Sequence, residues 1–243
     1  MLNPFIRKLE AFGPLPDEDR RSLEQSLGDA RRVDVDSDLV REGDRPAACQ
    51  LIVEGFACRH RTMGDGRRQI MSFEIAGDLC DLHGVLLGQA DHSITTLTPC
   101  TVAPIPHSTL TEWTTGRPAM ARALWLASLV DAAISREWIV NVGRRTAYGR
   151  AAHLLCEVVQ RLHSAGLAGH AHELPLTQLV LADALGLTPV HVNRTLQWLR
   201  GEGLIEFGGG SLTVRDWPGL KRAGGFDPAY LHQLQGVQAD VAA

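Results

Sequence analysis

Residues 177–200, TQLVLADALGLTPVHVNRTLQWLR, predict two short helices joined by a glycine turn. Thr177 is suited to cap the first helix, because a threonine hydroxyl accepts a hydrogen bond from a free amide of the first turn. Gly186 is suited to end that helix, since glycine adopts the left-handed conformation that often follows a helix. Thr188 can cap the second helix, with Pro189 at its first position. This order of caps and turn predicts a helix-turn-helix.

The second helix has two different faces. Its apolar side chains recur at helical spacing and are expected to pack on an apolar side of the first helix: Val192, Leu196 and Leu199 against Leu179, Ala182 and Leu185. Polar side chains crowd the N-terminal half of the opposite face, as in helices that enter the major groove of DNA. Arginine can bind guanine, asparagine and glutamine can bind adenine, and valine can contact a thymine methyl. We assign DNA contact to Thr177, Thr188, Pro189, Val190, His191, Asn193, Arg194 and Gln197.

A β-hairpin wing is predicted directly after these helices. Residues 203–214, GLIEFGGGSLTV, predict two strands joined by three glycines. The overall charge does not support nucleic-acid binding, because the net charge is −4 and residues 146–243 hold seven Lys or Arg against eight Asp or Glu. Phosphate binding must then come from a local patch, from helix N-termini and from contacts doubled in a dimer. A helical hairpin used only for packing is the alternative.

The rest of the chain predicts two further segments. Between Val33 and Pro106, short apolar runs are separated by Gly-Asp turns, which is typical of an antiparallel β-roll. Residues 117–145 predict one long helix, and we assign one apolar stripe of it to a dimer interface: Met120, Ala123, Ala127, Val130, Ile134 and Trp138. A central core helix is the alternative. The predicted fold is α+β, with a sensory β-roll domain and flanking helices over residues 1–116, a long dimerisation helix over 117–145, and a winged helix-turn-helix domain over 146–243.

Several classes of protein find no support in the sequence. The first 25 residues lack a signal-peptide pattern and no apolar run approaches bilayer length, which predicts a cytoplasmic protein without membrane contact. Five cysteines without a C-x-x-C pair are typical of reduced, packed thiols. The chain has no G-x-S-x-G, P-loop or G-x-G-x-x-G motif. We therefore assign no catalytic residue and expect no enzymatic activity.

The order of these segments is similar to that of the Crp/Fnr superfamily of bacterial transcription regulators, over nearly the whole chain. The motifs that carry the resemblance are REGD (41–44), LIVEGFACRHRTMGDGRRQIMSFEIAGD (51–78) and LADALGLTPVHVNRTLQWLR (181–200). The resemblance implies a homodimer that binds a two-fold-symmetric DNA site and contacts RNA polymerase, with the β-roll as sensor. Val190 stands where many members have a Glu, whereas Arg194 matches their Arg. The resemblance therefore implies the guanine contact made by that Arg but not the cytosine contact made by that Glu.

Departures from the family concern the signal. Members that bind cyclic nucleotides have a Glu for the ribose and an Arg-Ser pair for the cyclic phosphate, where this chain has Leu82 and His92-Ser93. Leucine accepts no hydrogen bond and neutral histidine is a poor anion clamp, which argues against cyclic AMP. The iron–sulfur members have clustered N-terminal cysteines, whereas the first cysteine here is Cys49, which argues against an iron–sulfur cluster.

The cofactor therefore stays open. CDLH (80–83) places a cysteine and a histidine three residues apart with His92 nearby, and such ligands bind transition metals or haem. The spacing matches no zinc pattern, so we predict no metal site. A metal, haem or thiol redox sensor is kept as an alternative, as is a signal-binding module that acts on a protein partner. The candidate ligand pocket comprises Cys80, Asp81, His83, His92 and Ser93.

Overall fold

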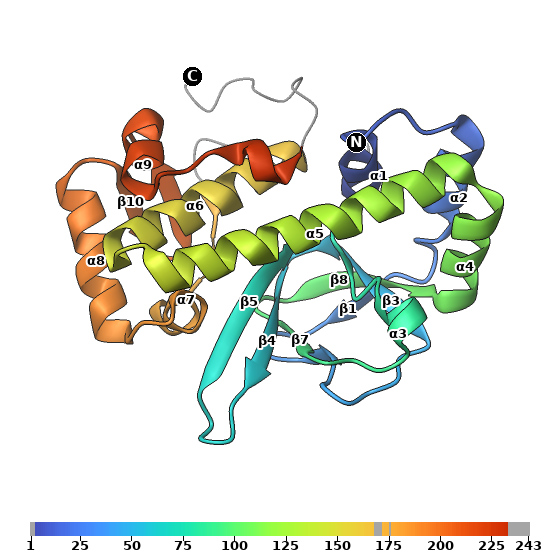
Figure 1. The fold of residues 1–243 in the computed structure, drawn as a ribbon, viewed down its shortest axis with the longest axis horizontal. Helices are drawn as coiled ribbons and strands as arrows, with labels where there is room; N and C mark the ends of the chain where they lie inside the picture. The colour runs from blue at the N-terminus through green and yellow to red at the C-terminus, as the bar shows by residue number, and fades with distance from the viewer. Residues whose placement is uncertain (1–2, 168–171, 175, 233–243) are drawn as a thin grey trace. The chain divides into compact units, whose positions relative to one another are not determined.

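The computed structural model describes residues 3–167, 172–174 and 176–232 (Figure 1). Two units share the chain. Residues up to 61 together with 73–132 form the first, and residues 62–72 together with the described residues from 133 onward form the second. The chain crosses from one unit to the other at residues 61–62 and 72–73, within a strand hairpin, and at residues 132–133, within one long helix.

Two four-stranded sheets form the roll. The first has the order β1 (Arg31–Val33), β8 (Cys100–Pro106), β3 (Ala48–Glu54), β6 (Leu79–Cys80), and the second has the order β2 (Asp38–Val40), β7 (Ser93–Thr96), β4 (Phe56–Thr62), β5 (Arg68–Ile75). The strands pair antiparallel around β8, β3 and β7. Apolar side chains of both sheets meet in one core: Val40, Ile52, Ala57, Cys80, Ile94, Cys100 and Val102. Because successive strand residues point to opposite faces, β3 and β8 also present a second apolar face.

Helices cover that second face. They are α1 (Pro4–Glu10), α2 (Asp17–Gln25), α4 (His107–Gly116) and the first half of α5 (Pro118–Arg144). A second core joins them to the sheet and includes Phe5, Leu9, Leu23, Leu51, Ile105, Leu110, Trp113 and Met120. The short helix α3 (Gly84–Leu87) follows β6. The first half of α5 is therefore part of the first unit, and one of its sides lies in the core of that unit.

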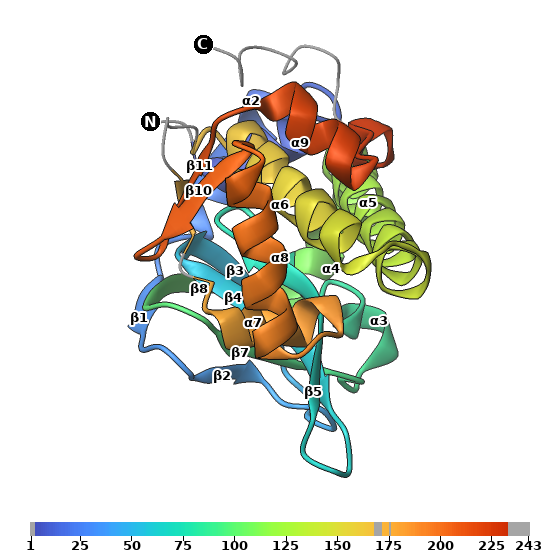
Figure 2. The same ribbon diagram turned by 90° about the vertical axis from the view of Figure 1, so that its left-hand side faces the viewer.

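The second unit is built around α6 (Ala147–Ser164), which packs against α8 (Pro189–Gly201) and α9 (Trp217–Gly224). Helix α7 (Gln178–Leu185) packs on α8 (Figure 2). The strands β10 (Ile205–Gly208), β11 (Ser211–Val214) and β9 (His172–Glu173) form a three-stranded sheet in the order β10-β11-β9. A 3-10 turn, η1, spans Pro228–Leu231. No helix in the described ranges is both long and apolar enough to cross a membrane.

The predicted fold class is confirmed: the chain is α+β, with an antiparallel roll, a long helix and a winged helix-turn-helix. The long helix was expected as a separate segment over 117–145. In the structure α5 is one continuous helix divided between the two units, because its first half packs with α1, α2 and α4 and its second half packs with α6. The hairpin tip at residues 62–72 belongs to the second unit, where Arg68 Nε donates to Asp183 Oδ2 of α7 at 2.8 Å.

Candidate nucleic-acid interface and ligand cluster

The helix-turn-helix has the predicted local structure. Thr177 Oγ1 accepts a hydrogen bond from Val180 N at 3.2 Å, and Thr188 Oγ1 accepts one from the backbone N of the residue three positions later at 3.3 Å. Between these caps Gly186 has φ +62°, a conformation that L residues rarely adopt. The two caps and the glycine set where α7 ends and where α8 begins.

Helix α8 has one buried face and one exposed face. Val192, Leu196 and Leu199 are buried, whereas Thr188, Pro189, Val190, His191, Asn193, Arg194 and Gln197 are all exposed. The first turn of α8 contains no acidic residue. The positive end of the helix dipole is therefore uncompensated at the end where the polar side chains gather.

The expected inward orientation of Leu179 is wrong. Its side chain is 59% exposed, while α7 buries Val180, Leu181, Ala182, Ala184 and Leu185. A step of three residues leaves each side chain about 60° behind the previous one, so two steps from Leu179 to Leu185 separate these side chains by about 120°. Leu179 and Leu185 therefore cannot both face the core, and the structure buries Leu185.

The structure adds Gln178 to the predicted surface. Asn193 Nδ2 donates to Gln178 Oε1 at 3.3 Å, so the exposed start of α7 and the exposed face of α8 form one polar surface. Thr177 is exposed at the same end of α7. Gln178 has no distinguishing pattern in the sequence apart from its position after a helix cap.

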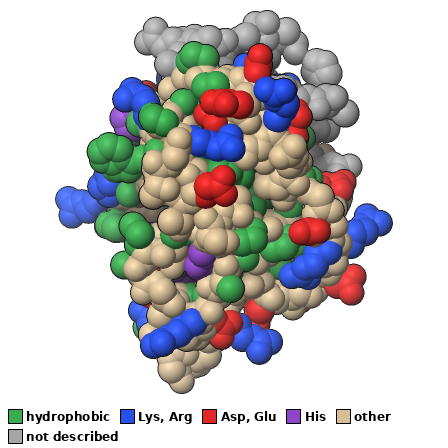
Figure 3. Space-filling model, turned by 90° about the vertical axis from the view of Figure 1, so that its right-hand side faces the viewer, with side chains coloured by type: hydrophobic (Ala, Val, Ile, Leu, Met, Phe, Trp, Pro, Cys, Tyr) green, Lys and Arg blue, Asp and Glu red, His purple; other side chains and the backbone are tan. Residues whose placement is uncertain are grey.

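The wing is attached to α8 through its backbone. Arg200 donates to the backbone carbonyl of Phe207 in β10. Glu206 of β10 and Arg215, the residue after β11, form an exposed ion pair at 2.7 Å. Figure 3 shows the side of the molecule opposite to the one in Figure 2, and on it Lys and Arg side chains are interspersed with Asp and Glu.

The stripe of α5 assigned to a dimer interface is buried within this chain. Met120, Ala123, Val130, Ile134 and Trp138 are at most 7% exposed, and Ala127 is half-buried against the core of the first unit. These six side chains already have intrachain partners, so the assignment to a dimer interface is wrong.

A second apolar stripe of α5 is exposed. Trp125 is 70% exposed and Ile139 is 72% exposed, and Leu129 and Val140 lie on the same side of the helix. Both stripes satisfy helical periodicity. The sequence alone does not tell which of them the chain covers by itself.

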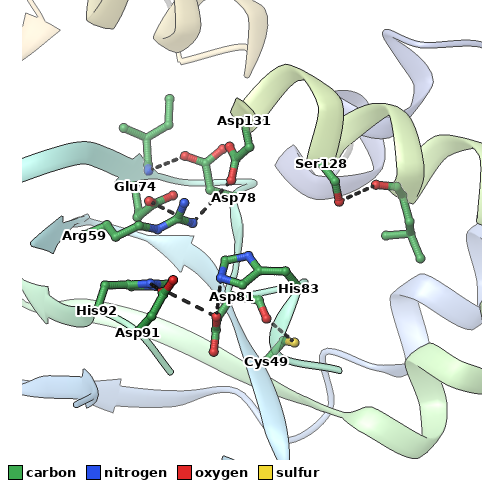
Figure 4. Close-up of polar contacts among 12 residues, drawn as sticks. Cys49, Arg59, Glu74, Asp78, Asp81, His83, Asp91, His92, Ser128 and Asp131 are labelled. Carbon is green, nitrogen blue, oxygen red and sulfur yellow. Dashed lines mark hydrogen bonds and ion pairs between the residues drawn. The ribbon is translucent and has the colours of Figure 1, made fainter. Parts of the chain in front are cut away.

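Three residues of the predicted ligand pocket lie together (Figure 4). His83 Nε2 is 3.0 Å from Asp81 Oδ1, and His92 Nε2 is 3.9 Å from the same oxygen. His92 Nδ1 is 2.6 Å from Asp91 Oδ1. Burial and the positive charge of Arg59 lower the pKa of His92, so its ring is neutral at pH 7.

The other two pocket residues are not part of this group. Cys80 lies in the core between the sheets, and burial raises the pKa of its thiol well above the usual range. Ser93 Oγ accepts a hydrogen bond from Glu42 N at 3.0 Å. Leu82, which stands at the ribose-binding position of the cyclic-nucleotide binders, packs against the core that contains α1 and α2. The loop between β6 and β7 thus brings together two histidines and one carboxylate, without a thiolate.

All five cysteine side chains are buried. Burial raises the pKa of Cys49 to about 12 and also raises the pKa values of Cys100 and Cys156. A reactive cysteine needs an accessible thiolate. The thiol-based alternative therefore has no support among these residues.

Two family models match the chain. Residues 30–114 match a cyclic nucleotide-binding domain, and residues 149–223 match a Crp-like helix-turn-helix domain. The first covers the roll and the second covers the region from α6 to α9.

Curated relatives and a solved structure agree with these matches. The chain is 31% identical to the nitrogen fixation regulation protein FixK of Azorhizobium caulinodans, over 71% of this chain and 69% of the relative. It is 29% identical to the transcriptional activator protein FnrL of Cereibacter sphaeroides, over 79% and 78%. Its fold is similar to that of FixK2 from Bradyrhizobium japonicum, with a TM-score of 0.72 and 24% identity over 80% of this chain and 96% of that one.

Proposed function

Because the chain belongs to the Crp/Fnr family of DNA-binding transcription regulators, we propose that it binds a two-fold-symmetric DNA site as a homodimer and acts there on RNA polymerase. The observation that carries this proposal is the division of α8 into a buried apolar face and an exposed face with Asn193, Arg194 and Gln197. These three side-chain types bind base edges in the major groove. No enzymatic role is proposed.

The homodimer is proposed to form through the exposed stripe of α5: Trp125, Leu129, Ile139 and Val140. A two-fold interface uses the same surface of both partners, and a long apolar stripe on one helix suits such self-pairing. The dimer would present two α8 helices about 34 Å apart, one turn of DNA.

We expect cyclic AMP to have no role as the signal. Leu82 is directed into the apolar core, and His92 is neutral and held beside Asp91, so neither can replace the Glu or Arg of the cyclic-nucleotide binders. FnrL is named a transcriptional activator, and we propose activation for this chain as well. The place of action is proposed to be the cytoplasm, where the DNA and the polymerase are.

Selection from a random double-stranded DNA library tests the proposal. We expect the full chain to enrich two inverted half-sites with centres about 10 base pairs apart. Arg194→Ala should weaken binding to the selected site by about 1–3 kcal/mol and relax the preference at one base pair in each half-site. In vitro transcription from a promoter with the selected site then measures the effect on RNA polymerase.

Arg21→Ala is the matched control, because Arg21 is an exposed arginine on α2, outside the helix-turn-helix. This variant should bind like the parent. If Arg194→Ala bound the selected site with the parent's affinity and preference, the assignment of α8 to the major groove would be wrong. If no sequence were enriched, specific DNA binding itself would be refuted.

A further inference from the structure

We propose that Asp81, His83 and His92 bind one divalent transition-metal ion such as Zn²⁺ or Co²⁺. One atom from each of the three side chains lies within 4.8 Å of the others. The distances from Asp81 Oδ1 to His83 Nε2 and His92 Nε2, 3.0 and 3.9 Å, lie on either side of the spacing of about 3.3 Å that ligands have around a tetrahedral zinc ion.

The carboxylate of Asp81 needs a cation. Its side chain is 2% exposed, and neither oxygen accepts a hydrogen bond from the residues that the structure describes. A buried carboxylate without hydrogen bonds is costly unless it is paired or binds a metal. His83 Nε2, 3.0 Å from Asp81 Oδ1, can form an ion pair with this carboxylate only when the imidazole is protonated.

His92 is oriented as a metal ligand. Its Nδ1 is bonded to Asp91 Oδ1 at 2.6 Å, which places the ring proton there and leaves the lone pair on Nε2. This Nε2 is buried, accepts no hydrogen bond from the described residues, and is directed towards Asp81 (Figure 4). A carboxylate behind a histidine whose other nitrogen lies in a cluster of ligands is the usual outer shell of a metal site.

The backbone is specialised around Asp81. Its φ is +62°, which is uncommon for a residue other than glycine and is often found where function requires a fixed side chain. Cys49 Sγ donates to the Asp81 carbonyl at 3.3 Å. A Cβ on Gly84 would lie 2.7 Å from Asp81 Oδ2, so any other residue there would displace the carboxylate. These features hold the carboxylate in place.

The donor set selects the class of ion. Two imidazoles and one carboxylate suit zinc and the first-row transition metals, whereas magnesium and calcium prefer oxygen ligands alone. Three protein ligands leave at least one position for water. The side chain of His83 is 40% exposed, which gives an ion a path to the site.

Titration of the tag-free, chelator-treated full chain with Co²⁺ and Zn²⁺ tests the site. We expect one ion per chain, with the visible absorption bands of Co²⁺ bound by nitrogen and oxygen. Asp81→Asn and His92→Gln should each weaken binding at least 10-fold, and so should Asp91→Asn, which removes the outer carboxylate. The side chain of Asp91 is 78% exposed, so this last variant tests the site with little risk to the fold.

His232→Gln is the control, since it removes an exposed histidine at the end of η1, outside the helix-turn-helix, and should leave metal binding and DNA binding unchanged. The site would be overturned if the parent bound neither ion, or if Asp81→Asn and Asp91→Asn both bound the ion as tightly as the parent does. DNA binding measured on the same samples separates the two proposals. Sequence-specific DNA binding without metal binding would refute only the metal site, whereas metal binding without DNA binding would refute only the proposed function.

Discussion

Arg59 Nη2 lies 3.3 Å from Asp131 Oδ2, and this ion pair joins strand β4 to helix α5. The same Nη2 is 3.5 Å from Glu74 Oε1. The Arg59 side chain is 12% exposed, so its charge depends on these two carboxylates more than on water. Of these two carboxylates, Asp131 lies on helix α5 and Glu74 lies on strand β5.

Asp131→Asn should lower the free energy of unfolding by about 1 kcal/mol, because the substitution keeps the shape and removes one of two compensating charges from a largely buried arginine. Urea denaturation of the full chain measures the change. Asp17→Asn is the control, since Asp17 is 89% exposed and its ion pair with Arg20 is open to solvent. Equal stability of Asp131→Asn and the parent would mean that Glu74 alone compensates Arg59.

Ile139→Asp should prevent dimer formation. A carboxylate at this position of a two-fold apolar interface would be buried in both partners, each time without its hydration shell. Sedimentation of the variant should show a monomer, and binding to the selected DNA should weaken because the contacts are no longer doubled. Val35→Asp alters a residue of the roll that is 48% exposed and should remain dimeric. A dimeric Ile139→Asp would place the interface elsewhere.

Glu157 is an acceptor at the centre of the second unit. It is fully buried and accepts hydrogen bonds from Trp138 Nε1 at 2.9 Å and from Tyr230 Oη at 2.7 Å. Glu157→Ala should reduce the free energy of unfolding by about 3 kcal/mol, because both donors lose a buried acceptor. Glu157→Gln retains a carbonyl oxygen and should cost less than half as much. Equal losses in the two variants would show that the charge beside Arg161, rather than the acceptor, is required.

His153 should make the protein less stable in acid. Burial and the charge of Arg145 lower the pKa of His153 to about 4, against about 6.5 in the unfolded chain. The unfolded chain then binds the extra proton first, so the stability due to neutral His153 is present above pH 6.5 and is lost as the pH falls towards 4. The difference in unfolding free energy between the parent and His153→Gln should decrease by up to about 1.4 kcal/mol per pH unit in this window. A constant difference would contradict the lowered pKa.

Local signals made the helix-turn-helix predictable. The caps Thr177 and Thr188 and the turn at Gly186 act within a few residues, so the sequence around them is sufficient. The buried face of α8 follows from the same periodicity. The polar contact between Gln178 and Asn193 crosses the turn and requires the packed pair of helices.

Long-range packing decided what the sequence left open. Helix α5 has two apolar stripes, and only the positions of the other helices show that the one with Met120 is internal and the one with Trp125 is exposed. Asp81, His83 and His92 could be selected as a pocket, but the exclusion of Cys80 depends on which side of β6 faces the core. Gly84 becomes informative only when the Asp81 carboxylate is seen beside it.

Because the cysteine thiols are buried, their rate of alkylation measures how often the structure around each of them unfolds. Cys49, Cys58, Cys80 and Cys100 lie in the first unit and Cys156 lies in the second. An alkylating reagent reaches a buried thiol only when the surrounding structure opens. Mass spectrometry of the labelled peptides would therefore time the opening of each unit separately, in the unmodified protein and without an added probe. The same measurement in the presence of DNA or metal would show which unit each ligand stabilises.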